Sequence, residues 1–377
     1  MESIQIRLKA DAIPMPGIVN PGPHQIFCNP VVSVEKQALE HLKEDEIKVE
    51  MIYAGLCGTD IHLIKKNRKT GYIKSSAPLS IPDGQGRRIG HEGVGRVIEK
   101  GNRVKHINVG SYVTFESIVV CHYCDVCRKG HFNQCRNARL LGLEKDGLFG
   151  NIVNVPAMLA HDITGFIKTD ADLRAMSCVE PAGVAYVACQ NTKIKGGDNV
   201  IIFGAGPIGI FTAILSKTIF GASTVHMVEP VKFRREFARQ WADHVYDLSE
   251  FEENLFENID VVIEAAGDMN NINTIFPSIN PNGRVALLAR SGAPLQIDAM
   301  DHMITNAISI IGSRGHLCGA FSDIMILYQQ GRIPLDSIVT HVVDGIEALG
   351  QLLKDPDKII QENCKVLARL NHEPVEL

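Results

Sequence analysis

The chain lacks any apolar run long enough to cross a membrane, and its first residues lack the charged-then-apolar layout of a secretory signal. It also has no excess of basic residues, because 38 Lys and Arg stand against 43 Asp and Glu and the formal net charge is -5. A dedicated nucleic-acid binder normally has the opposite balance. Internal repeats and low-complexity tracts are absent too. We therefore expect a globular cytoplasmic protein whose partners include neither a membrane nor a nucleic acid.

What is present is enough apolar material for two cores in 377 residues. Residues 1 to about 185 are rich in Gly, Pro and short strand-like runs, which predicts an irregular β-rich domain. From about residue 196, apolar strands alternate with helices, and this pattern predicts an α/β domain with a doubly wound parallel sheet. We expect domain ranges of 1–185 and 186–317, with the tail 318–377 packing back on the first domain.

Four cysteines fall within one short segment with the spacing C-x2-C-x2-C-x7-C, namely Cys121, Cys124, Cys127 and Cys135. Four thiolates can close a tetrahedral shell around one zinc ion and leave no position for water, which is typical of a structural site. A pair of disulfides is one alternative, although a reducing compartment and the close spacing disfavour it. A redox or iron–sulfur role is the other.

A glycine-rich turn, Gly204-Ala205-Gly206-Pro207-Ile208-Gly209, follows a predicted strand and opens a predicted helix. In that context the glycines allow a tight turn, approach of a pyrophosphate and close helix packing, and the helix N-terminus favours an anion. Glu229 ends the next predicted strand, where a carboxylate can accept both ribose hydroxyls of an adenosine. We therefore predict NAD rather than NADP, although Arg234 and Arg235 could soften this preference. A purely structural turn is the alternative.

A second set of potential metal ligands is scattered along the chain: Cys57, His91, Glu92 and Glu180. One thiolate, one imidazole and one or two carboxylates suit a zinc ion that keeps a position for water or substrate. Taken singly, each residue has an ordinary interpretation as a core thiol, a hydrogen-bonded histidine or a surface carboxylate. Their joint occurrence with a dinucleotide turn favours a catalytic zinc.

The order of these motifs resembles the zinc-dependent medium-chain alcohol dehydrogenase family. CGTDxxH, GHExxGxV, the four cysteines, Glu-Pro, GxGPxG and an acid follow one another over essentially the whole chain. The Glu-Pro at Glu180, in place of a cysteine ligand, is similar to the branch that contains sorbitol, threonine and butanediol dehydrogenases. The resemblance implies a GroES-like catalytic domain, a Rossmann coenzyme domain, an active site in the cleft between them and two zinc ions per chain, one catalytic and one structural.

The resemblance also implies roles for residues near the catalytic zinc. Cys57 and His91 match its first two ligands, and Glu92 and Glu180 match carboxylates that bind it directly or through water. Thr59 matches the residue that accepts the substrate hydroxyl proton, His62 the outer end of the proton relay, and Asp60 a partner that orients His91. His62 could instead be a solvated loop histidine.

The implied reaction is hydride transfer between NAD and a secondary alcohol or ketone, within a polyol, sugar, cyclitol or amino alcohol. A homodimer or homotetramer is implied as well. The alternative is a non-catalytic relative that only binds zinc and a dinucleotide. The basic, Gly/Pro-rich segment 65–88 is either a solvated loop or a partial lid over an anionic substrate or subunit partner. His316 is either a loop histidine or a residue that faces the site.

Overall fold

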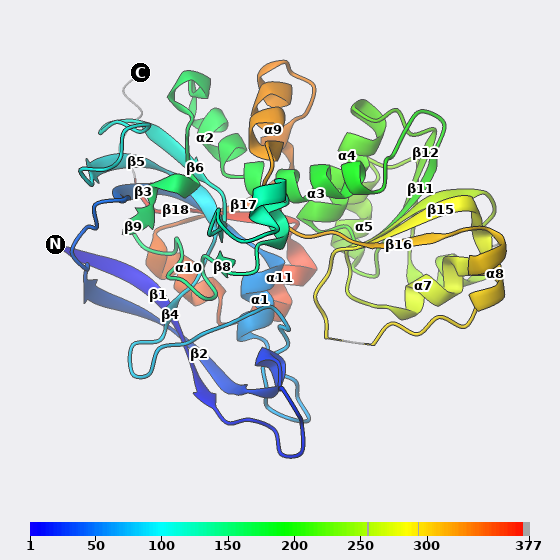
Figure 1. The fold of residues 1–377 in the computed structure, drawn as a ribbon, viewed down its shortest axis with the longest axis horizontal. Helices are drawn as coiled ribbons and strands as arrows, with labels where there is room; N and C mark the ends of the chain where they lie inside the picture. Colours follow the sequence, from blue (N-terminus) through cyan, green and yellow to red (C-terminus); the bar gives the residue numbers. More distant parts are fainter. Residues whose placement is uncertain (255, 293, 372–377) are drawn as a thin grey trace. The chain divides into compact units, whose positions relative to one another are not determined.

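The computed structural model describes residues 1–254, 256–292 and 294–371, and the chain divides into two compact units (Figure 1). Unit 1 contains Met1–Glu180, Pro334–Ile359 and the described residues from Lys365 onward, and unit 2 contains Pro181–Ile333 and Ile360–Cys364. The tail that was expected to return to the first domain is therefore divided, because its residues up to Ile333 belong to unit 2.

The largest sheet of unit 1 has the strand order β10-β6-β5-β3-β18-β17, and β9 pairs with β3 beside this path. All its pairs are antiparallel except β17 with β18. Its strands are β3 (Glu46–Leu56), β5 (Glu92–Lys100), β6 (Tyr112–Phe115), β9 (Ile152–Pro156), β10 (Ala160–Asp162), β17 (Val339–Asp344) and β18 (Lys365–Arg369). The β-rich character predicted for this part of the chain is confirmed.

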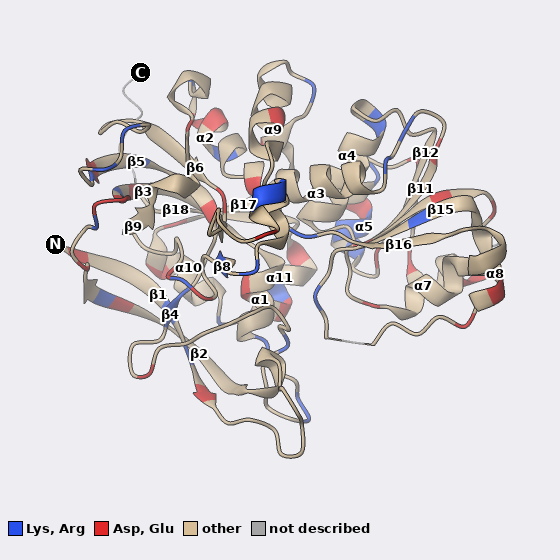
Figure 2. Ribbon diagram, in the orientation of Figure 1, with Lys and Arg blue, Asp and Glu red and all other residues tan. Residues whose placement is uncertain are grey.

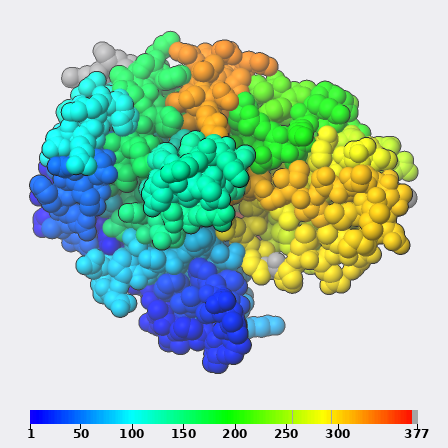
Figure 3. Space-filling view, in the orientation of Figure 1, coloured from blue at the N-terminus to red at the C-terminus, as the bar shows by residue number. Residues whose placement is uncertain are grey.

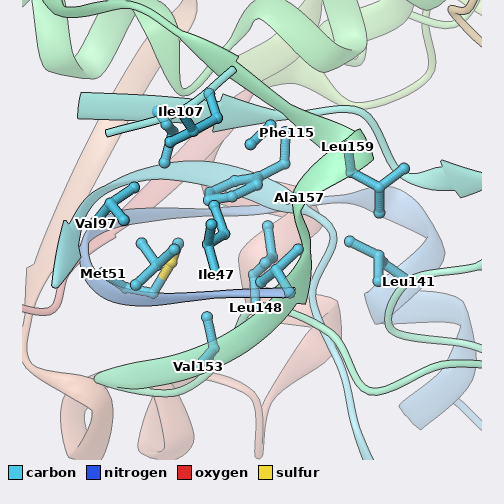
Figure 4. Close-up of a cluster of buried hydrophobic side chains, with 14 of the residues drawn as sticks. Ile47, Met51, Val97, Ile107, Phe115, Leu141, Leu148, Val153, Ala157 and Leu159 are labelled. Atoms are coloured by element: carbon cyan, nitrogen blue, oxygen red, sulfur yellow. The ribbon is translucent and has the colours of Figure 1, made fainter. Parts of the chain in front are cut away.

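Buried and partly exposed residues alternate along β3, and the buried ones form part of a hydrophobic core. Ile47, Val49 and Met51 are fully buried, while the residues between them are partly exposed. Their side chains pack with Phe115 of β6 and with further apolar residues in one cluster, most of which is drawn in Figure 4. Successive residues of a strand point to opposite faces, so this spacing gives β3 one apolar face.

Two smaller sheets complete unit 1. The first has the order β2-β1-β4, with β1 (Glu2–Ala12) and β2 (Phe27–Ala38) forming a long antiparallel hairpin and β4 (Arg87–Arg88) beside β1. The second pairs β7 (Ile118–Val119) with β8 (Arg139–Leu140). The helices that lie wholly or largely in this unit are α1 (Gly58–Ile64), α2 (Asp170–Met176), α10 (Ile346–Leu352) and α11 (Pro356–Glu362).

Unit 2 is a six-stranded parallel sheet with the order β13-β12-β11-β14-β15-β16. Its strands are β11 (Asn199–Phe203), β12 (Thr224–Val228), β13 (His244–Tyr246), β14 (Ile259–Glu264), β15 (Ile279–Leu287) and β16 (Ser309–Gly312). The helices along the same stretch are α3 (Val179–Asn191), α4 (Pro207–Thr218), α5 (Lys232–Ala238), α6 (Leu248–Glu253), α7 (Asn270–Ile275), α8 (Met300–Thr305) and α9 (Ala320–Gln329).

This arrangement confirms the doubly wound parallel sheet predicted from the alternation of apolar strands and helices. The strand order is the one in which the chain reverses direction across the sheet between its first and fourth strands, as in dinucleotide-binding folds. Ile201, Val262 and Phe276 belong to one buried cluster under the sheet. The edge strand β13 has only three residues, which are too few to give a periodic signal in the sequence.

No helix within the described residues is long and apolar enough to span a membrane. Acidic and basic residues are interspersed along both units in Figure 2, which agrees with the balanced composition.

Candidate active site

The junction between β3 and α1 presents the first group of predicted site residues. β3 ends at Leu56, Cys57 caps the helix, and α1 begins at Gly58, so that Thr59 lies in its first turn. The backbone amide of Thr59 favours the charged form of the Cys57 sulfur. Burial raises the pKa of the Cys57 thiol to about 11, and the negative charges of Asp60 and Glu180 act in the same direction. A bound divalent cation would reverse this balance in favour of the thiolate.

Asp60 ties this junction to a distant part of the chain. Its side chain is fully buried, and its carboxylate accepts hydrogen bonds from the backbone N–H groups of Cys57 at 3.0 Å and Gly90 at 3.1 Å. Burial raises the pKa of Asp60, whereas His91 and the two N–H donors oppose that shift. The nearer oxygen lies 3.8 Å from Nδ1 of His91, beyond hydrogen-bond distance. In this geometry Asp60 hydrogen-bonds the backbone of Cys57 and of Gly90, and it lies near the His91 imidazole without a hydrogen bond to it.

His91 and Glu92 reach the same place because Gly90 permits an unusual backbone turn. Gly90 has φ of +87°, and a Cβ there would lie 2.1 Å from the Phe149 ring. Directly afterwards, Glu92 starts β5 and pairs with Gly55 of β3. A side chain at Gly55 would also clash, since its Cβ would lie 2.8 Å from the Glu92 carboxylate. Glycine at both positions therefore lets the two ligand-bearing strands approach closely.

The structure brings three of the four predicted ligands together. The donor atoms of Cys57, His91 and Glu92 all lie within 4.8 Å of one another. His91 Nδ1 and Glu92 Oε1 are buried and have no hydrogen-bond partner among the described residues. Buried polar atoms of this kind are costly unless something binds them. One thiol, one imidazole and one carboxylate at this separation fit a zinc ion.

Glu180 lies outside this group of three. It is in the first turn of α3, is 6% exposed, and accepts a hydrogen bond from the Ser117 hydroxyl at 3.0 Å. Its charge nevertheless acts on Cys57, as the raised thiol pKa indicates. His62, which follows on α1, is half-buried, and its carbonyl accepts the backbone N–H of Lys74 at 3.3 Å. The relay through Thr59 and His62 stays a prediction.

Lys365 is a site residue that the sequence reasoning missed. It starts β18, which pairs antiparallel with the end of β3, and it is fully buried. Its Nζ donates to the carbonyl of Leu56 at 3.1 Å and forms an ion pair with Oε2 of Glu92. Burial lowers the pKa of Lys365 to about 8, against the opposing charges of Cys57 and Asp60. The sequence signal that could have indicated this residue is a lysine at the start of the largely apolar strand KVLAR.

The four clustered cysteines form a separate group. Their sulfurs lie within 4.8 Å of one another, and the structure joins none of the four in a disulfide. The backbone N–H of Cys124 points at the Cys121 sulfur at 3.4 Å, and that of Cys121 points at Cys135 at the same distance. Such donors favour thiolates, and four thiols in one shell fit a closed zinc site. In Figure 3 this segment, coloured blue-green, lies at the surface of unit 1.

The glycine turn of unit 2 follows β11 and opens α4, as predicted. Gly204 has φ of +96°, and a Cβ at Gly209 would lie 1.9 Å from the Gly204 carbonyl oxygen. Only glycine fits these two positions. A Cβ at Gly206 would meet nothing nearer than Arg234 at 3.7 Å, so the turn is open at the position expected to face a pyrophosphate.

Glu229 is held against this turn. One of its carboxylate oxygens accepts the backbone N–H of Ala205 at 2.7 Å, and the other accepts that of Val231 at 2.9 Å. Arg234 donates to the carbonyl of Asn363 at 2.9 Å. Arg235 instead donates to the carbonyls of Glu229 and Pro230. The carboxylate thus has a fixed position at the end of β12, with Arg234 across the turn.

The basic segment 65–88 does not act as one unit. Arg87 and Arg88 are buried in β4, and Arg87 pairs with Asp146 at 3.0 Å. Lys65 pairs with Asp357, whereas the lysines and arginine between them on the loop are exposed. A description of the whole segment as a loop is therefore wrong for its last two residues. His316 is buried and its ring packs against Phe321.

Comparison with known proteins places this geometry in a family. The sequence model of the alcohol dehydrogenase GroES-like domain matches residues 43–165, and that of the zinc-binding dehydrogenase matches residues 207–327. L-threonine 3-dehydrogenase of Pyrococcus abyssi is 32% identical over 315 residues, which cover 80% of this chain and 85% of that protein. Scyllo-inosose 3-dehydrogenase of Thermotoga maritima is 30% identical over 361 residues, 88% of either chain.

Among solved structures, that of a Thermotoga maritima protein assigned as an alcohol dehydrogenase superposes with a TM-score of 0.84 at 27% identity. The superposition covers 98% of this chain and 100% of the other chain. The alternative of a non-catalytic relative is not favoured by these similarities, since the named relatives are dehydrogenases. The chain belongs to the zinc-dependent medium-chain alcohol dehydrogenase family, with a GroES-like domain and a Rossmann domain, and is an oxidoreductase that acts on an alcohol.

Proposed function

We propose that the protein uses NAD to oxidise a secondary alcohol within a polyol, sugar, cyclitol or amino alcohol, or to reduce the corresponding ketone. The observation that carries this proposal is the convergence of the donor atoms of Cys57, His91 and Glu92 in a chain that also has the open glycine turn. The relatives named for threonine and for an inosose act on hydroxyl groups with polar neighbours, which supports this substrate class.

The proposed roles follow from the chemistry of the donor set. A zinc ion bound by Cys57, His91 and Glu92 would supply Lewis acidity that lowers the pKa of a substrate hydroxyl. Thr59 would accept the hydroxyl proton, because its side chain can accept and donate at once. His62 would release that proton to water, because an imidazole can accept a proton on one nitrogen and donate one from the other. The carboxylate of Glu180 would stay near the zinc-binding residues, held by the hydrogen bond from the Ser117 hydroxyl.

NAD rather than NADP is proposed from the position of Glu229. Its carboxylate is buried and fixed by two backbone N–H groups at the end of β12, where an adenosine ribose would lie. A negative charge there would repel a 2′-phosphate. Two zinc ions per chain, a dimeric or tetrameric assembly and a cytoplasmic location stay predictions.

The catalytic assignment is tested by Cys57→Ser. We expect zinc, measured by elemental analysis, to fall from two ions per chain to one, and NAD-dependent polyol oxidation to fall more than about 100-fold because a metal ligand is lost. Cys28→Ser, which changes a buried thiol of the same unit outside both clusters, is the matched control. Full turnover by Cys57→Ser would contradict the proposal.

A different outcome is expected for Cys124→Ser. Loss of one thiolate from a closed shell should remove the structural zinc and lower Tm by several degrees, since each kcal/mol shifts Tm by roughly 2–4 °C in a domain of this size. Dinucleotide affinity, measured by NADH fluorescence, should stay near the wild-type value because the glycine turn is untouched. An unchanged Tm and zinc content would refute a structural role for the cluster.

Lys365→Met tests the buried ion pair with Glu92. Without zinc, removal of the ammonium leaves an uncompensated buried carboxylate, and we expect the protein to lose roughly 3–5 kcal/mol of stability. Added zinc should restore much of this loss, because Glu92 is then available to the cation. The measurement is the rise in Tm on zinc addition, which should be larger in Lys365→Met than in the wild type. Lys365→Arg, which keeps the charge, serves as control, and equal rises in all three proteins would disprove the idea.

Glu229→Gln tests the coenzyme preference while keeping the size of the side chain. We expect the ratio of NADPH to NADH dissociation constants to fall by about tenfold or more, since about 1.4 kcal/mol of repulsion corresponds to a factor of ten. Both constants are measured by titration of the protein with reduced coenzyme. A ratio equal to that of the wild type would remove the reason for naming NAD.

A further inference from the structure

Three buried arginines gather around one carboxylate in unit 1, outside the clustered metal ligands. Arg7 lies in β1, and Arg87 and Arg88 make up β4, which pairs with β1 and is blue in Figure 2. The three residues are 4%, 7% and 5% exposed, respectively. The carboxylate is that of Asp146, in the loop after β8. Arginine is seldom buried to this extent unless a partner offsets its charge.

Asp146 is shared by the three arginines. Its Oδ2 lies 3.2 Å from Nη1 of Arg7, while its Oδ1 lies 3.0 Å from Nη1 of Arg87 and accepts the backbone N–H of Arg88 at 3.2 Å. Burial opposes ionisation of Asp146, but the three guanidinium charges, that of Arg88 most, lower its pKa. One carboxylate therefore leaves two positive charges uncompensated. The charge of Glu40 also acts on Arg88, but Glu40 is exposed and water screens its effect.

Two of the arginines fasten neighbouring segments of the chain. Besides the shared carboxylate, Arg7 donates to the carbonyls of Gln85 at 2.7 Å and Gly86 at 2.9 Å. Arg87 donates to the carbonyl of Ser80 at 2.8 Å and to its hydroxyl at 3.3 Å. Each guanidinium nitrogen of Arg7 and Arg87 thus has an acceptor within the protein.

Arg88 differs from these two. Its Nε donates to the carbonyl of Gly147 at 2.7 Å, but Nη1 and Nη2 have no hydrogen-bond or ion-pair partner in the part of the chain that the structure describes. Arg88 stands directly opposite Arg7 in the antiparallel pair, where like charges repel. Burial lowers the pKa of Arg88 to about 10 against the opposing charge of Asp146, and the charge of Arg7 reinforces the effect of burial. Open donors on an almost fully buried cation are costly unless an acceptor binds them.

We propose that Nη1 and Nη2 of Arg88 bind a phosphate group, and that Arg7 and Arg87 help to neutralise its charge. The planar donors of a guanidinium match two oxygens of one phosphate. A phosphate group carries about two negative charges near neutral pH, which offsets the charge that Asp146 leaves uncompensated, whereas a carboxylate would offset only half of it. The side chain of Asp146 is 35% exposed, so solvent reaches the edge of the cluster. This site does not depend on the proposed reaction.

β4 leads directly into the segment that carries His91 and Glu92. The backbone N–H of Gly147 donates to the Arg88 carbonyl at 2.7 Å, which holds this segment to the loop of the shared carboxylate. A phosphate on Arg88 would remove the repulsion between β4 and β1. We therefore expect the ligand to stabilise the folded protein, since it binds an arrangement that the unfolded chain lacks.

The binding test is a calorimetric titration of the NADH-saturated protein with inorganic phosphate at constant ionic strength. We expect one phosphate to bind per chain in the wild type and in the control Arg103→Gln, which changes an exposed arginine of the same unit that pairs with Glu44. In Arg88→Gln the dissociation constant should rise at least about tenfold, because charged hydrogen bonds are lost. Arg88→Lys, which keeps the charge but not the match to two oxygens, should weaken binding by a smaller factor. Equal affinity in Arg88→Gln and Arg103→Gln would overturn the inference.

Further arms of this titration identify the anion and its position. Acetate should bind at least about tenfold more weakly than phosphate, and equally tight acetate would contradict a site for a doubly charged anion. Either inorganic phosphate or glucose 6-phosphate should bind more tightly, which distinguishes the free ion from an ester, and both results support the site. Arg234→Gln changes the arginine next to the glycine turn. Loss of phosphate binding there, with unchanged binding in Arg88→Gln, would assign the anion to that turn and refute the proposal.

Thermal unfolding provides a readout that needs neither NADH nor turnover. Phosphate, compared with chloride at the same ionic strength, should raise Tm of the wild type and Arg103→Gln but not that of Arg88→Gln. If Arg88 were only structural, Arg88→Gln would have a lower Tm in both buffers and keep the same response to phosphate. That result would overturn the inference. Because no measurement here uses an alcohol, failure of the proposed reaction would leave the anion site standing.

Discussion

The buried carboxylate of Asp60 is the constraint on which the site in unit 1 depends. It accepts one backbone N–H from Cys57 and one from Gly90, and so fixes two segments whose side chains carry the clustered donor atoms. Burial of a carboxylate away from water costs free energy unless hydrogen-bond donors contact it. The two backbone segments must therefore lie close together around Asp60. Glycine at positions 90 and 55 allows this close approach, because a side chain at either position would clash with the neighbouring segment.

Charge is the second organising factor in this unit. Asp60, Glu92 and Glu180 act on the same small volume, and the described basic residue that reaches into it as a hydrogen-bonded cation is Lys365. Nδ1 of His91 and Oε1 of Glu92 are buried without a hydrogen-bond partner among the described residues, and a divalent cation would both bind them and offset the negative charge. Glu92 is shared between two potential partners, the ammonium and the metal. That competition links the metal affinity of the site to a residue of the last described strand.

In unit 2 the charged group beside the glycine turn is also a carboxylate, that of Glu229. Both oxygens of this carboxylate accept backbone N–H groups of nearby residues, which fixes a negative charge at the end of β12. Arg290 and Arg314 follow β15 and β16 at the same edge of the sheet.

The sequence by itself determined the features that depend on residues close together in the chain. The spacing of Cys121 to Cys135 and of Gly204 to Gly209, the alternation of β3 and the apolar strands of unit 2 were sufficient for the fold class, because local chain geometry brings those residues together whatever the rest does. Only the tertiary structure decided that β18 returns to β3 and buries Lys365 against Glu92, that Glu180 lies apart from the three clustered ligands, and that Arg87 and Arg88 are buried. It also decided the order of the parallel strands of unit 2, since strand order sets which distant residues become neighbours and no short-range pattern records that order.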